Sequence, residues 1–309
     1  MNIRAFLVLG IAVLGLGVTA PPAKAQTFVR TIGSGPGSGN GQLNGPIGVA
    51  VDTANGSNVL VADSSNNRVE VFSAAGAFIR TIGSGPGSGN GQFSVPYGVA
   101  VDTANGSNVL VADRDNNRIE VFSAAGSFIR TIGSGPGSGD GQLNAPGGVA
   151  VDTANGSNVL VADRGNDRVE VFSSAGSFIR TIGSGPGSGN GQLNVPWSVA
   201  VDTANGSNVL VVDRANDRVE VFSSAGTFIR TIGSGPGSGN GQLSFPIGIA
   251  VDAANGTALV VDFSNTRIEV FRSGDPLPVP ALGTWGVLLS ALLLAGAGYF
   301  GARRSLPIR

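Results

Sequence analysis

The stretch GSGPGSGNGQ, which begins at Gly33, decides how this chain is divided. It occurs five times with a spacing of 50 residues, the last from Gly233, and only the copy from Gly133 differs, in having Asp140. A run this rich in Gly and Ser is typical of a flexible linker. Five linkers would separate five small units, whereas five connections within one body would join the parts of a single fold.

The repeat extends well beyond the Gly-rich run. The segment PIGVAVDTANGSNVLVADSSNNRVEVFSAAGAFIRTIG starts at Pro46, and its relatives start at Pro96, Pro146, Pro196 and Pro246. Each unit holds four short runs: GVAVD and RVEVF alternate in hydrophobicity, NVLVAD is nearly continuous, and FIRTIG ends at the Gly-rich stretch. The Asn-Gly pair in TANGSN predicts a hairpin turn, because both residues tolerate positive φ. Each unit is therefore predicted to be a four-stranded antiparallel meander.

Four strands with apolar residues on both faces need neighbours, and radial stacking of such sheets buries both faces. The predicted fold is an all-β, five-bladed β-propeller over residues 26–273. After the leader the chain opens with TFVRTIG from Thr27, a fourth strand alone, and it closes with a first, second and third strand up to Phe271. We expect the N-terminal strand to complete the last blade. The Gly-rich runs are then the crossings from the outer strand of one blade to the inner strand of the next.

Composition excludes several functions. Between residues 26 and 284 there are 14 Arg and no Lys against 15 Asp and 5 Glu, and a mildly acidic body argues against a nucleic-acid partner. The chain has no Cys and no His, which removes disulfides, thiolate nucleophiles and the commonest metal ligand. We therefore expect no cofactor and no metal.

The two ends resemble targeting segments. Residues 1–25 combine Arg4, an apolar run and the small-x-small sequence Ala23-Lys24-Ala25, the pattern of a secretory signal peptide. After a Pro-rich linker at 274–281, residues 282–302 contain no charge and are long enough to cross a bilayer. The arginines in the tail 303–309 predict that this tail stays cytoplasmic and that the body lies outside.

The pattern P-x-G-V-A-V-D, V-A-D-x-x-N-x-R-[VI]-x-V-F and G-x-F-I-R-x-I-G resembles the NHL repeat, and it covers Thr27 to Phe271. Many NHL propellers have six blades, which leaves open a missing blade or closure through a partner chain. The resemblance also implies a possible enzyme, because similar propellers include a zinc-dependent lyase that uses His and metal-dependent lactonases. Lactonase chemistry needs acidic groups at the axis, but the five Glu occupy one third-strand position away from it. A non-catalytic protein is expected, with a lactonase-type hydrolase as the alternative.

The C-terminal segment resembles the IPTL-CTERM sorting signals, relatives of PEP-CTERM. The residues that carry this resemblance are Val279, Pro280, Leu282, Trp285, Gly286, Arg303 and Arg304. It implies recognition by an exosortase-like membrane protease, which releases or transfers the body to the cell surface. A plain single-pass anchor, with the body in the periplasm, is the alternative.

A repeated acidic–basic pair is expected to be structural, because a single active site needs no five-fold copy. In each unit an Asp ends the second strand and an Arg starts the third, so a charge-assisted hydrogen bond would brace the turn. The pairs are Asp63 and Arg68, Asp113 and Arg118, Asp163 and Arg168, Asp213 and Arg218, and Asp262 and Arg267. The run Asp113–Asn117 starts like a calcium loop but lacks its glycine and its bidentate Glu.

Differences among the five units gather at two places, the residues flanking the Pro and the second-to-third-strand turn. In a meander both lie on one face of the disc, which we call the variable face. Arg with Tyr and Trp is the usual composition of a binding patch. The predicted ligand-binding residues are Tyr97, Trp197, Arg114, Arg164, Arg214, Ile47 and Ile247. We expect this face to bind a protein or a glycan; alternatively, the two aromatic side chains only fill the centre of the ring.

Overall fold

The computed structural model describes residues 29–272, and two compact units divide between Thr31 and Ile32. The first unit is described only over Val29–Thr31, which form no regular secondary structure. Every strand belongs to the second unit. The predicted signal peptide, the linker, the C-terminal helix and the tail lie outside the described residues. Within residues 29–272, no helix is long and apolar enough to cross a membrane.

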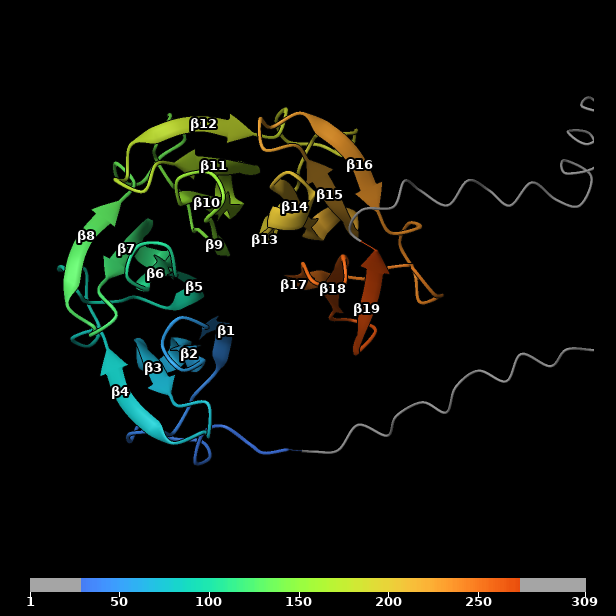
Figure 1. Ribbon diagram of the computed structural model, residues 1–309. Coiled ribbons are helices and arrows are strands. Elements are labelled where there is room, and N and C mark those ends of the chain that lie inside the picture. The colour runs from blue at the N-terminus through green and yellow to red at the C-terminus, as the bar shows by residue number, and fades with distance from the viewer. Residues whose placement is uncertain (1–28, 273–309) are drawn as a thin grey trace, which may run out of the picture. The chain divides into compact units, whose positions relative to one another are not determined.

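Five antiparallel sheets make up the second unit, and they form a five-bladed β-propeller (Figure 1). Blade 1 contains β1 (Pro46–Asp52), β2 (Asn58–Asp63), β3 (Arg68–Phe72) and β4 (Phe78–Ile82). Blade 2 contains β5 (Pro96–Asp102), β6 (Asn108–Asp113), β7 (Arg118–Phe122) and β8 (Phe128–Ile132). Blade 3 contains β9 (Val149–Asp152), β10 (Asn158–Asp163), β11 (Arg168–Phe172) and β12 (Phe178–Ile182). Blade 4 contains β13 (Pro196–Asp202), β14 (Asn208–Asp213), β15 (Arg218–Phe222) and β16 (Phe228–Ile232), and blade 5 contains β17 (Pro246–Asp252), β18 (Thr257–Asp262) and β19 (Arg267–Arg272).

The fifth blade departs from the expectation. Its sheet has three strands, β17-β18-β19, and Val29–Ile32 form no strand. The predicted closure of this blade by the N-terminal strand is therefore wrong for the described part of the chain, and Phe28 lies outside it. As a result, the outer edge of β19 is not hydrogen-bonded to another described strand.

Apolar side chains between neighbouring blades hold the propeller together. Leu60, Val69 and Val71 of blade 1 pack with Val99 and Val111 of blade 2, and all five are at most 7 % exposed. The same contact repeats between the later blades. Because each sheet has one such face toward each neighbour, a blade buries both faces only when it stands between two others.

The Gly-rich crossings are ordered connections rather than linkers. The Arg68 guanidinium donates hydrogen bonds to the carbonyl oxygens of Ser38, Gly39 and Gln42, each at 2.8 Å. The Glu70 carboxylate accepts the Gly41 N–H at 2.7 Å, so a buried acid of blade 1 also fixes the crossing that leads into that blade. Charge-assisted hydrogen bonds of this kind are stronger than neutral ones. The crossings therefore join the parts of one body.

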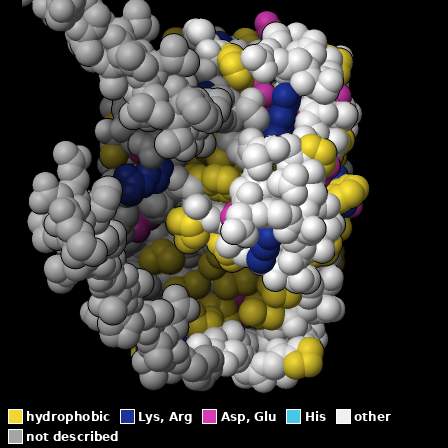
Figure 2. Space-filling model, turned by 90° about the vertical axis from the view of Figure 1, so that its right-hand side faces the viewer, with side chains coloured by type: hydrophobic (Ala, Val, Ile, Leu, Met, Phe, Trp, Pro, Cys, Tyr) yellow, Lys and Arg dark blue, Asp and Glu magenta, His cyan; other side chains and the backbone are white. Residues whose placement is uncertain are grey.

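A seam lies between the first and last blades, and its two sides are exposed apolar faces. Val49 on β1 is 67 % exposed, whereas its equivalents Val99, Val149 and Val199 are 5–7 % exposed. Leu259, Ile268 and Val270 on blade 5 are 36–59 % exposed, whereas their equivalents in blades 1–4 are 0–2 % exposed. On this side of the molecule, hydrophobic side chains gather in a hollow (Figure 2). The seam thus presents both halves of a blade–blade interface that is formed everywhere else.

Candidate functional site

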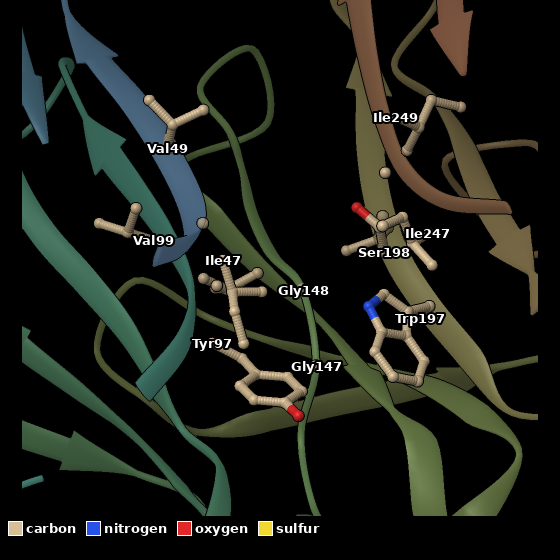
Figure 3. A pocket seen from close by; sticks show the side chains of 15 residues that line it. Ile47, Val49, Tyr97, Val99, Gly147, Gly148, Trp197, Ser198, Ile247 and Ile249 are labelled. Carbon is tan, nitrogen blue, oxygen red and sulfur yellow. The ribbon is translucent and has the colours of Figure 1, made fainter. Parts of the chain in front are cut away.

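The inner strands of the blades surround an axial cavity of about 200 Å³. Near its mouth it is lined by the residue that follows the repeat proline in each blade: Ile47, Tyr97, Gly147, Trp197 and Ile247. Figure 3 shows Tyr97 and Trp197 on different strands around this space, with Ile47 and Ile247 beside them. The structure therefore brings four of the seven predicted binding residues to one mouth.

Small residues allow the inner strands to approach one another closely around the cavity. A Cβ atom on Gly98 would lie 2.7 Å from the Gly147 carbonyl oxygen, and one on Gly148 would lie 2.8 Å from the Ser198 Cα. Real Cβ atoms do not come so close to backbone, so these positions require glycine. The close approach keeps the inner strands together around the cavity and holds Tyr97, which precedes Gly98, at its mouth.

The three predicted arginines stack with aromatic rings beside this mouth. The Arg114 guanidinium carbon lies 4.9 Å from the centre of the Tyr97 ring. The Arg164 guanidinium carbon lies 5.6 Å from the Tyr97 ring centre and 3.8 Å from that of Trp197. These distances are within cation–π range. Arg164 thus contacts both aromatic residues that the sequence singled out, whose ring centres are 6.0 Å apart.

A further stacking contact between an arginine and an aromatic ring involves the fifth unit. The Arg214 guanidinium carbon lies 4.4 Å from the Trp197 ring centre and 5.0 Å from that of Phe245. Phe245 was not among the predicted binding residues. The available signal was its position directly before the repeat proline, on the other side of that proline from the Tyr97 and Trp197 positions. We call the alternating set Arg114, Tyr97, Arg164, Trp197, Arg214 and Phe245 the arginine–aromatic ladder.

Each ladder arginine is placed by the turn between the second and third strands. In blade 2, Arg114 is the first residue of a 3-10 turn, Arg114–Asn116, and Asn117 ends it in the left-handed conformation at φ 55°. The preceding Asp113 is fully buried and accepts hydrogen bonds from the Ser94 N–H and from Asn116. Burial raises the pKa of the Asp113 carboxyl, while these hydrogen bonds and Arg118 oppose the change. These contacts of Asp113 hold the turn that positions Arg114.

Backbone strain also concentrates on the variable face. Val95 and Val195, just before the repeat prolines, have φ of 53°, a region that β-branched residues rarely occupy. The Val95 N–H donates to the Asn67 side-chain oxygen of the neighbouring blade at 2.8 Å, which helps to hold the conformation. Strained conformations that the surroundings maintain cluster at functional sites. Here it flanks the arginine–aromatic ladder.

The predicted structural pairs come together in all five blades. The Arg Nε to Asp Oδ2 distance is 2.7–2.9 Å in each pair. Each of these arginines also contacts the third-strand Glu of its blade, as Arg118 does with Glu120 at 3.0 Å. Burial raises the pKa of Glu120 and of Glu170 to about 7, although the neighbouring Arg charge opposes the change.

The acidic residues lie away from the axial cavity. None of the residues that line it is Asp, Glu or His, and the described part of the chain contains no cluster of three His, Cys, Asp or Glu residues that could hold a metal ion. The residues that carry the sorting-signal resemblance, from Val279 to Arg304, lie outside the described residues. Chemically, the cavity mouth offers guanidinium donors, aromatic edges and backbone amides.

Comparisons with known proteins agree with this architecture. A domain family described as a 6-bladed beta-propeller matches residues 49–132. None of the curated proteins compared with the chain matches it in sequence. At 13–21 % identity, the similar solved structures show the fold alone: this chain is a β-propeller. They include the nidogen–laminin complex (21 % identity, 74 % of this chain and 80 % of that chain, TM-score 0.52), a protein of unknown function from Bacteroides caccae (14 %, 75 % and 80 %, 0.53) and the hydrazine synthase of Kuenenia stuttgartiensis (13 %, 80 % and 80 %, 0.52).

Proposed function

We propose that this propeller is an exported, non-catalytic NHL-like binding module whose variable face captures a glycan or a protein. The arginine–aromatic ladder is the observation on which the proposal rests. It combines Trp, Tyr and Arg, the residue types that dominate binding energy at interfaces, beside a recess at the propeller axis.

The contrast between the two faces supports a binding role. On the opposite face, the turn TANGSN is the same in blades 1–4 and the residues within it serve the fold. Ser107 of blade 2, for example, donates a 2.7 Å hydrogen bond to Asp52 of blade 1. On the variable face the equivalents of Arg114 are Ser64 in blade 1 and Phe263 in blade 5, and neither residue type is needed to form the turn. Side chains that differ from blade to blade on the same backbone can form a site that is specific for one ligand.

A lactonase-type hydrolase is the weaker candidate. Hydrolysis assisted by a metal needs acidic or His ligands that converge on the substrate. In the described residues, the third-strand glutamates are engaged with Arg68 and its equivalents and with the Gly-rich crossings. The residues of the axial mouth are instead suited to recognition by hydrogen bonding and charge.

Export and sorting belong to the same proposal. The signal peptide at 1–25 would deliver the body across the inner membrane, and the segment 282–302 would anchor it until an exosortase-like protease releases or transfers it. Mass spectrometry of the mature protein tests this. We expect an N-terminus near Gln26 and a C-terminus before Leu282, and an intact C-terminal segment would favour a permanent anchor.

Loss of binding on removal of the two ladder rings tests the proposed site. We expect the variant Tyr97→Ala/Trp197→Ala to lose capture of the probes named in the next subsection, because the rings hold Arg164 in place. The matched control is Ile79→Ala/Ile129→Ala, which trims two exposed side chains of the outer strands β4 and β8. Equal binding by both variants, with unchanged melting temperatures, would remove the variable face as the binding site.

A further inference from the structure

The charges of the ladder arginines are not balanced by acidic partners. In the described residues, Arg114 pairs with Asp115 at 3.4 Å, but Arg164 and Arg214 form no ion pair. The arginines of the structural pairs differ, since Arg68 contacts both Asp63 and Glu70. An added anion would therefore stabilise each arginine at the cavity mouth more than it would stabilise an arginine that already has acidic partners.

Arg164 differs from the other arginines in its hydrogen bonding. Among the described residues, the buried Nε atoms of Arg114, Arg164 and Arg214 have no partner, and the same is true of the outer-strand arginines Arg80, Arg130 and Arg180, but only Arg164 also has a buried Nη1 without a partner. Burial, and after it the charge of Arg114, lowers the pKa of the Arg164 guanidinium, while its interaction with Tyr97 opposes the change. Unsatisfied donors and like charges at close range are costly unless a ligand supplies oxygen atoms.

The ring faces are engaged by the arginines. Arg164 and Arg214 both lie over Trp197, at 3.8 Å and 4.4 Å from its ring centre, so the two guanidiniums are separated by less than the sum of those distances. Arginine side chains thus lie over the indole, where a sugar ring would otherwise stack. The ladder therefore presents a series of guanidiniums, which match oxyanions that recur along a chain.

We propose that the ladder binds an acidic polysaccharide through its carboxylate or sulfate groups, with Arg164 as the central contact and Arg114 and Arg214 on either side. This inference rests on the proposed function and names its ligand class. A sugar chain fits better than a protein surface here. The mouth carries three arginines with one acidic partner among the described residues, whereas the core of a stable protein interface is depleted of charge.

Binding by the purified protein to polygalacturonate, dextran sulfate, neutral dextran and poly-glutamate tests the inference by titration calorimetry at two salt concentrations. We expect binding to the two acidic polysaccharides that weakens with salt, and none to dextran. The variant Arg114→Gln/Arg164→Gln/Arg214→Gln should lose about 100-fold in affinity or more, because charge-assisted contacts are lost. The control Arg80→Gln/Arg130→Gln/Arg180→Gln removes the same charge from the outer strands and should bind within about twofold of the parent.

Each contrary outcome has a distinct meaning. Equal loss in both arginine variants would overturn the inference, because binding would then follow net charge rather than the ladder. Binding of dextran as strongly as polygalacturonate, if abolished by Tyr97→Ala/Trp197→Ala, would overturn the acidic class but leave the proposed function standing. Tighter binding of poly-glutamate than of either polysaccharide would replace the glycan by an acidic protein. Absence of binding to every probe would overturn the inference, while the proposed function would still require a different ligand.

Discussion

Duplication of one repeat should close the seam between the first and last blades. An in-frame tandem copy of residues 173–222 adds one complete 50-residue unit, from the end of one third strand to the end of the next. Blades 1 and 5 expose the two halves of a blade–blade interface, so we expect one added blade to bring these faces together. The face of β1 would then contact the face of the last blade, as neighbouring blades already do.

The gain can be worked from the exposed side chains. Val49, Val51, Leu259, Ile268 and Val270 are 36–67 % exposed, about half of each side chain. Complete burial of such a side chain contributes about 2 kcal/mol, so closure should add about 5 kcal/mol to the free energy of unfolding. This is an upper estimate, since the unfolded chain already covers part of this surface. For a domain of this size it corresponds to a rise of about 10–20 °C in melting temperature.

Thermal unfolding followed by circular dichroism measures the effect, and one substitution locates it. In the six-unit chain, Val49→Ala should cost about 2 kcal/mol, as a newly buried valine does. In the five-unit chain the same change should lower the free energy of unfolding by only a few tenths of a kcal/mol, because this side chain is exposed. Val99→Ala, at the equivalent buried position, is the control and should cost about 2 kcal/mol in both chains. An unchanged or lower melting temperature after duplication would refute the reasoning, and so would equal costs of Val49→Ala in the two chains.

Two further predictions follow from buried acids. In blade 4, Ser207 donates a 2.8 Å hydrogen bond to Asp152 of blade 3. The fifth unit lacks one residue near Thr257 and has no equivalent of Ser207. The Asp202 Oδ1 of blade 4 is therefore buried without a partner among the described residues. Insertion of Ser after Gly256 should restore the donor and add about 1 kcal/mol to the free energy of unfolding measured by urea denaturation, whereas insertion of Ala should not. Equal effects of the two insertions would contradict this. The second concerns pH: because burial raises the pKa of Glu120 and Glu170 from 4.5 to about 7, the folded state holds these protons more tightly than the unfolded chain does. Their contribution to stability is complete below pH 4.5 and is lost as the pH rises through about 7, so the melting temperature should fall across this interval and Glu120→Gln/Glu170→Gln should flatten the fall. A slope that these substitutions leave unchanged would show that other groups govern it.

The sequence by itself determined the strands and their order. Alternating runs, Asn-Gly turns and the 50-residue period are local signals, and they predicted strands close to the observed bounds, as for β3 at Arg68–Phe72. One detail of the Asn-Gly turn differed. Positive φ falls on Gly56 and Ser57 rather than on Asn55. Comparison of the units also pointed to the variable face, since substitutions that the fold does not require are visible without coordinates.

Only the tertiary structure decided what the repeats do to one another. Val49 and Val99 stand in nearly the same local sequence, yet one is exposed and the other buried, because burial depends on whether a neighbouring blade is present. The same holds for the ladder. Its members come from four units, and Phe245 joins it because Arg214 of the preceding blade lies 5.0 Å from its ring centre. Periodicity reports what each residue prefers locally, whereas burial at the blade interfaces and stacking at the axis depend on contacts between units, such as that of Arg164 with Tyr97.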